Sequence, residues 1–142
     1  MAKTRTYLDA NVILNALAGD EAISTIALEI IEDPGKTLLV SDYLWLEVRP
    51  KMGYHKQATQ AVFVDEIFNA AETIPSDNDL LNIAKTIALR YGLNAMDALH
   101  AAAAIKGDAD ELITFEKPGK PFFRIPADTL RIVSLYPFIP HF

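Results

Sequence analysis

Short apolar segments alternate with segments of helical periodicity along this 142-residue chain, and this alternation constrains the fold more than any other feature. In the helical segments, apolar side chains recur every three or four residues, as Ile23, Ala27 and Ile30 do. Strands that alternate with helices form parallel sheets, because each helix returns the chain to the edge where the next strand begins. We therefore expect one α/β domain over residues 1–142, a three-layer α/β/α structure with a central parallel sheet of four or five strands.

The expected elements follow from these periods and from the glycines and prolines between them. The expected strands span 6–9, 37–41, 72–75, 111–115 and 129–135. The expected helices span 12–18, 20–33, a segment that starts at 41 or 42, 56–71, a segment from 76 or 77 to 90, and 94–107. Pro50 is expected to break or restart the third of these helices. Residues 116–126 contain three prolines and a glycine, so we expect an irregular loop there.

Composition excludes several classes of protein and site. The chain has no cysteine, which rules out disulfides, thiolate metal sites and thiol nucleophiles. We see no signal peptide and no membrane-spanning segment, so we expect a cytoplasmic protein with no membrane partner. The net charge of −6 argues against broad electrostatic binding of nucleic acid.

Acidic residues fall where the expected sheet ends. Asp9 ends the first strand, Glu116 follows the fourth, Asp97 lies in the first turn of a helix, and Glu47 follows the second strand. In an open parallel sheet, ligands bind beyond the carboxyl ends of the strands. We therefore expect these four acids to face one region.

Each acid also has a simpler explanation as a helix cap, a first-turn acid or a partner of a nearby lysine. The apolar sequence around Asp97 ("AMDALHAAAA") and around Glu47 ("LWLEV") favours a shared cation instead, because a lone buried carboxylate is unfavourable. With oxygen ligands throughout, that cation is Mg²⁺ or Mn²⁺. Asn11 adds a neutral oxygen that can hold water or substrate.

Four segments in the same order resemble the PIN-domain nucleases, and in particular the toxin-type (VapC-like) members of prokaryotic toxin–antitoxin pairs. They are "YLDANVIL", the stretch from Ser41 to Glu47, "NAMDALHAAAA" and "LITFE". The resemblance covers about residues 6 to 116. It implies a PIN-like fold and a metal-dependent nuclease that acts most often on RNA.

The resemblance also implies roles for individual residues. Asp9, Glu47 and Asp97 match the three principal acids of the family, Asn11 matches the polar residue two positions after the first acid, and Thr114 matches a hydroxyl near the site. The chain departs from the family at Glu116, where an aspartate is usual, and no further acid follows before Asp128. This difference puts a second metal ion in question more than a first.

We accordingly assign Asp9 and Asp97 as central metal ligands, and Glu47 and Glu116 as outer or second-site ligands. All four would be catalytic. The expected residues that orient water or substrate are Asn11, Thr114 and Ser41, and the expected phosphate contacts are Lys117, Lys120 and Arg49. The expected partners are an RNA substrate, a small antitoxin protein and a second copy of the chain. The apolar tail "YPFIPHF" could pack on a neighbour or on its own domain.

Two other functions remain open at this stage. One is a haloacid-dehalogenase-type phosphatase with Asp9 as nucleophile, although Asn11 stands where that class has a second aspartate. The other is a non-catalytic PIN scaffold that binds RNA or protein. His55, His100 and His141 lack the spacing of a zinc site, and His100, one turn after Asp97, is expected to make a hydrogen bond within the fold.

Overall fold

The computed structural model describes residues 2–137, and its five strands form one parallel sheet in the order β3-β2-β1-β4-β5. The strands are β1 (Thr4–Leu8), β2 (Lys36–Ser41), β3 (Glu72–Ile74), β4 (Glu111–Thr114) and β5 (Ile132–Ser134). The expected α/β fold with a central parallel sheet is confirmed.

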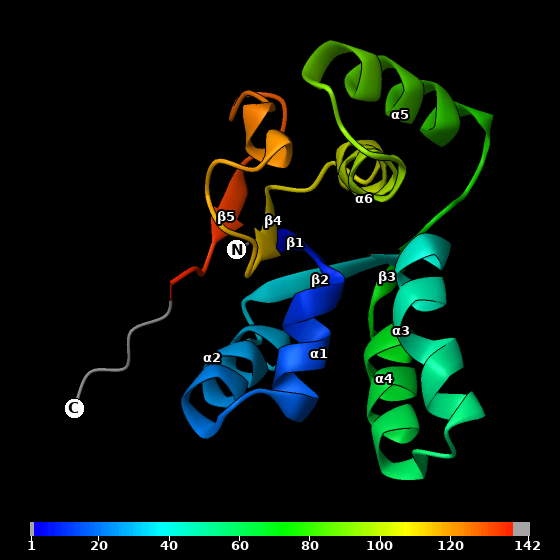
Figure 1. The fold of residues 1–142 in the computed structure, drawn as a ribbon, viewed down its shortest axis with the longest axis vertical. Helices are drawn as coiled ribbons and strands as arrows, with labels where there is room; N and C mark the ends of the chain where they lie inside the picture. Colours follow the sequence, from blue (N-terminus) through cyan, green and yellow to red (C-terminus); the bar gives the residue numbers. More distant parts are fainter. Residues whose placement is uncertain (1, 138–142) are drawn as a thin grey trace.

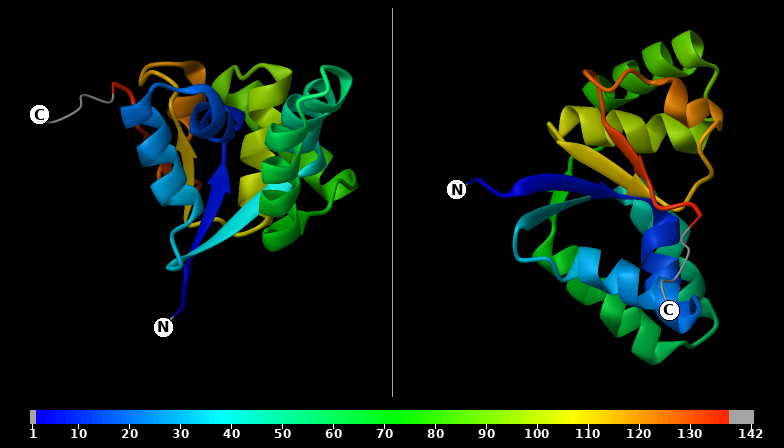
Figure 2. Two further views of the ribbon diagram at one scale, coloured as in Figure 1. Left: turned by 90° about the horizontal axis from the view of Figure 1, so that it is seen from below. Right: turned by 90° about the vertical axis from the view of Figure 1, so that its left-hand side faces the viewer.

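Helices cover both faces of the sheet, which gives three layers (Figures 1 and 2). On one face lie α1 (Ala10–Ala18), α2 (Glu21–Ile31), α3 (Asp42–Tyr54) and α4 (Ala58–Ala70). On the other lie α5 (Asn78–Tyr91), α6 (Ala95–Lys106) and a short 3₁₀ helix, η1 (Pro121–Arg124). Within the described residues, no helix has the length and apolar character needed to cross a membrane.

Two separate hydrophobic cores form because successive side chains of a strand point to opposite faces. Tyr7 packs in the core beneath α5 and α6, whereas its neighbour Leu8 packs in the core beneath α1, α3 and α4. The four alanines at 101–104 of α6 are fully buried, and these small side chains, which point to all sides of the helix, let it pack closely between the sheet and α5.

Two expectations about prolines were wrong. Helix α3 continues through Pro50, although an interior proline removes a hydrogen bond and costs about 3 kcal/mol in a helix. Val48 and Met52 are both buried on the same core, so packing on either side of Pro50 outweighs the local cost. The 116–126 loop contains η1, where Pro121 occupies the first turn and needs no backbone N–H. Most of the apolar tail, including His141, lies outside the described residues.

The connections place a crevice at the carboxyl edge of the sheet. From β1 the chain builds β2 and then β3 on one side, and it then crosses to β4 and β5 on the other side of β1. The strand order therefore reverses between β1 and β4. Open α/β sheets bind ligands at the carboxyl ends of the strands at such a point. Asp9 directly follows β1, and Glu116 lies two residues beyond β4.

Candidate active site

Asp9 is fixed at the junction of β1 and α1 by hydrogen bonds to both of its carboxylate oxygens. As the N-cap of α1 it accepts a bond from the backbone N–H of Ala10 at 2.8 Å. Its other oxygen accepts a bond from the hydroxyl of Thr114, at the end of β4, at 2.7 Å. Asp9 therefore caps α1 with one carboxylate oxygen and contacts the neighbouring strand β4 with the other.

Asn11 and Thr114 tie the loop after β4 to helix α1. The Asn11 carbonyl oxygen accepts a bond from the N–H of Phe115 at 3.0 Å. The Thr114 hydroxyl accepts bonds from the N–H of Glu116 at 3.0 Å and from the amide of Asn11 at 3.3 Å. Thr114 is completely buried, so its hydroxyl positions Asp9 and the backbone of Glu116.

Asp97 lies in the first turn of α6, where Asn94 caps the helix by accepting a bond from the Asp97 N–H at 2.8 Å. Partial burial raises the pKa of its carboxyl group above the ordinary value, and the charges of Asp9, Glu116 and Glu47 raise it further. This repulsion means that the four acids, from four different segments, share one electrostatic environment.

Glu47 meets His100 across the layers. A carboxylate oxygen of Glu47 on α3 is hydrogen-bonded to Nε2 of His100 on α6, and this bond lowers the pKa of Glu47 below the ordinary glutamate value. The expectation that His100 makes a hydrogen bond within the fold is confirmed. Its other ring nitrogen, Nδ1, lies 2.7 Å from the hydroxyl of Tyr7.

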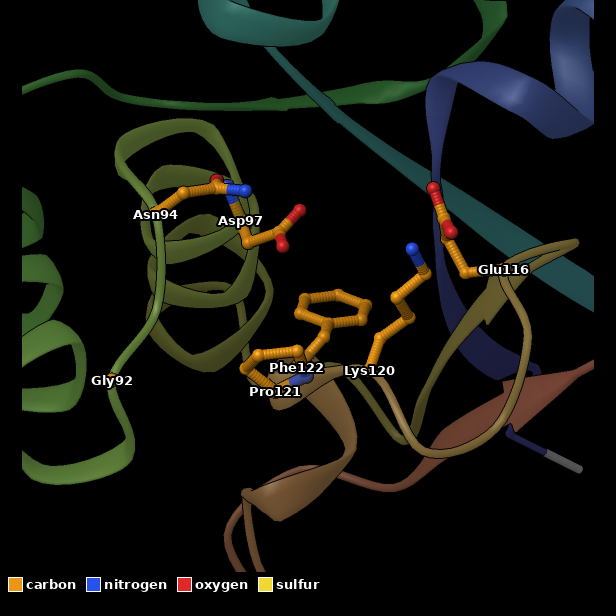
Figure 3. Close-up of a pocket in the computed structure, with 7 residues that line it drawn as sticks. All are labelled: Gly92, Asn94, Asp97, Glu116, Lys120, Pro121 and Phe122. Atoms are coloured by element: carbon orange, nitrogen blue, oxygen red, sulfur yellow. The ribbon is translucent and has the colours of Figure 1, made fainter.

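A cavity of about 320 Å³ adjoins two of these acids (Figure 3). Asp97 and Glu116 line it from two sides, and the side chain of Lys120 extends toward the space between them (Figure 3). The remaining lining comes from Gly92, Asn94, Pro121 and Phe122. The cavity thus combines two carboxyl groups with one ammonium group, a set that can hold a cation and a phosphate together.

The other expected site residues lie elsewhere. Arg49 forms an ion pair with Asp65 at 2.8 Å, and Lys117 is exposed on the loop without lining the cavity. Ser41 is completely buried, with its hydroxyl 2.7 Å from that of Tyr7, so it does not face a substrate. Within residues 2–137, no three acidic or histidine side chains are already gathered as the ligands of one ion.

Tyr7 is the participant that sequence reasoning missed. It precedes Asp9 by two residues and reads as one more apolar strand residue, yet its hydroxyl contacts both Ser41 and His100. A tyrosine in a fully buried strand needs a hydrogen-bond partner for its hydroxyl. This requirement could have predicted a polar contact of Tyr7 from the sequence.

Solved structures share this fold at low sequence identity. A chain of VapBC2 from Rickettsia felis, in a complex bound to a DNA fragment from the promoter, aligns with a TM-score of 0.66 and 18% identity, covering 92% of this chain and 98% of that one. A chain of a toxin–antitoxin complex from Klebsiella pneumoniae gives a TM-score of 0.67 and 24% identity over 92% and 98%. FitAcB from Neisseria gonorrhoeae gives 0.60 and 20% over 91% and 96%.

A search among curated proteins found no match. The family comparison is decisive, because the PIN domain model matches residues 6–118, which include all four acids and the four strands β1 to β4 apart from the start of β1. It leaves the phosphatase alternative without support. This chain belongs to the PIN domain family.

Proposed function

We propose that the protein is a divalent-metal-dependent endoribonuclease and the toxin of a toxin–antitoxin pair. The observation that carries the proposal is that Asp97 and Glu116, from two different segments, line one cavity beside the carboxyl edge of the sheet, where burial and the charges of Asp9, Glu116 and Glu47 raise the pKa of Asp97. An acid whose pKa is raised by burial and by like charges in a cavity is typical of a site that is completed by a cation. The presence of a toxin–antitoxin complex among proteins of this fold supports the biological role.

The residues fit Mg²⁺ or Mn²⁺ by donor chemistry, because every candidate ligand is an oxygen and at least Asp97 and Glu116 border the same cavity. Asp9 and Asp97 would be the central ligands, with Glu47 and Glu116 as outer ligands. Such an ion, when bound, lowers the pKa of a coordinated water and polarises the scissile phosphate.

The protein's own groups supply the rest of the chemistry. Asn11 and Thr114 hold Asp9 and the loop that carries Glu116, so the acids keep their places when the substrate arrives. Lys120 would bind a non-bridging phosphate oxygen as negative charge builds during in-line attack. Lys117 and Arg49 would contact phosphates farther along the RNA strand. Arg49 would first have to leave its ion pair with Asp65.

The proposed assembly is a complex with a small antitoxin and a second copy of the chain, in the cytoplasm. Helix α3 exposes large apolar side chains that a partner could cover, namely Trp45, Leu46 and Tyr54. Large apolar side chains that remain exposed on the outer part of a helix are typical of interaction surfaces.

The test combines calorimetry and RNA cleavage with Asp97→Asn. We expect the variant to bind Mn²⁺ at least tenfold more weakly than wild type, by about 1.4 kcal/mol, and to lose Mn²⁺-dependent cleavage. The matched control is Asp79→Asn, an exposed acid in the first turn of α5, which should behave as wild type.

Two results would count against the proposal. Cleavage and Mn²⁺ affinity that survive in Asp97→Asn would show that the acids do not form the site. Wild-type protein that binds RNA but does not cleave it with either metal would favour the non-catalytic scaffold. The feature that favours this alternative is Glu116, which is exposed and has a longer side chain than the aspartate usual at this position in the family.

A further inference from the structure

A buried chain of hydrogen bonds runs from the end of β2 to the candidate site. It passes from the Ser41 hydroxyl to that of Tyr7 at 2.7 Å, on to His100 Nδ1 at 2.7 Å, and through His100 Nε2 to Glu47. Ser41 and Tyr7 are completely buried and His100 is 3% exposed, whereas the Glu47 side chain is 35% exposed. This series of hydrogen bonds therefore starts in the core at Ser41 and ends at the partly exposed carboxylate of Glu47.

The protons in this chain can be placed by counting donors. Glu47 is an acceptor, so Nε2 of His100 carries a proton. The Ser41 oxygen already accepts a bond from the backbone N–H of Leu44 at 3.2 Å. Two arrangements of the remaining protons are then conceivable, and they differ in whether Nδ1 of His100 accepts or donates.

If Nδ1 donated, the Tyr7 hydroxyl would have to donate to Ser41, and the proton of Ser41 would find no acceptor within the chain. Among the described residues the Ser41 hydroxyl bonds only to Tyr7 and to the Leu44 N–H, and Ser41 is completely buried, so that proton would be buried without an acceptor. If Nδ1 accepts, every proton is used: Ser41 donates to Tyr7, Tyr7 donates to His100, and His100 donates to Glu47. This direction needs only a neutral imidazole.

We propose that Ser41, Tyr7 and His100 form a one-way hydrogen-bond relay that fixes the His100 tautomer and holds one oxygen of Glu47, leaving only the other oxygen for a cation or its water. Ser41, Tyr7 and His100 are positioning residues, because they contact neither the cation nor its water. Helix α6 then sets two acids at once, Asp97 directly and Glu47 through His100 one turn later. The relay deepens the proposed function, since it rests on Glu47 being a ligand.

The first measurement needs no activity. In metal-free protein, ¹⁵N NMR of the His100 ring should show Nε2 protonated and Nδ1 unprotonated. In Tyr7→Phe, Nδ1 loses the hydrogen bond that it accepts, so the Nδ1 shift should change, whereas Nε2 should stay protonated because it still donates to Glu47. The control is Tyr91→Phe, a partly buried tyrosine outside the relay, which should leave the His100 shifts unchanged. A protonated Nδ1 in wild type would overturn the relay.

The second measurement tests positioning through Mn²⁺ affinity. Loss of a group that orients a ligand typically weakens metal binding about tenfold or more, so we expect this for Tyr7→Phe and His100→Leu. His100→Gln, whose amide can both accept and donate, should recover part of the loss, and it can stand in if Tyr7→Phe does not fold. Equal Mn²⁺ affinity in wild type, His100→Leu and His100→Gln would overturn the positioning role. Wild type that binds no Mn²⁺ would overturn the proposed function, while the ring tautomer would still decide the relay.

Discussion

At the scale of single residues, the carboxyl group of Asp97 opposes the stability of the fold that holds it. Burial and three neighbouring acids raise its pKa, which means that the folded protein binds this proton more readily than the unfolded chain does. Glu47 shows the opposite behaviour, because the hydrogen bond from His100 lowers its pKa and favours its charged form. The pKa values of these two acids thus shift in opposite directions because their surroundings differ.

The raised pKa of Asp97 predicts a pH-dependent gain in stability for Asp97→Asn. As pH rises from below the ordinary aspartate value of 3.8 through the raised value, the wild-type protein loses stability that the uncharged asparagine retains. The free energy of unfolding of Asp97→Asn, relative to wild type, should therefore increase across this window and then level off. Urea denaturation in EDTA over a series of pH values measures it. A difference that stays constant with pH would contradict the prediction.

At the scale of secondary structure, the sequence predicted most of what local chemistry controls. The alternating periods located the five strands and six α-helices that the structure describes within residues 2–137, because the cores on the two sides of the sheet require these periods. Pro50 failed as a helix breaker because Val48 and Met52 are held by contacts with residues distant in sequence. The approach of Tyr7 to His100, 93 positions apart, likewise depends on how α6 lies on the sheet.

Helix α6 predicts a sharp sensitivity to side-chain size. Ala102 is completely buried in the core that surrounds this helix, so Ala102→Leu must displace neighbouring atoms and should destabilise the protein by about 1–3 kcal/mol. The matched control is Ala70→Leu, at an exposed position near the end of α4, which should change stability by less than about 0.5 kcal/mol. Urea denaturation measures both, and equal effects would show that α6 does not pack closely.

At the scale of the whole molecule, the proposed function requires an acidic protein to attract a polyanion. The net charge of −6 would repel RNA at long range, so attraction would have to come from local cations at the proposed site. Lys120 has the right place for this, since it lines the same cavity as Asp97 and Glu116. With the part of the chain that the structure describes, Lys120 forms no ion pair within 4 Å, so its ammonium group is not neutralised by a single carboxylate.

Lys120→Gln should therefore change RNA and metal binding in different directions. A charge-assisted hydrogen bond contributes about 1.5 kcal/mol or more, so loss of the ammonium group should lower kcat/KM for RNA about tenfold. Mn²⁺ affinity should stay the same or increase, because the variant removes a positive charge from beside the acids. Lys117→Gln, on the same loop but outside the cavity, removes the same charge and should affect both quantities less. Weaker Mn²⁺ binding in Lys120→Gln, or equal loss of cleavage in both variants, would mean that Lys120 acts through loop structure or total charge and not by contact with phosphate.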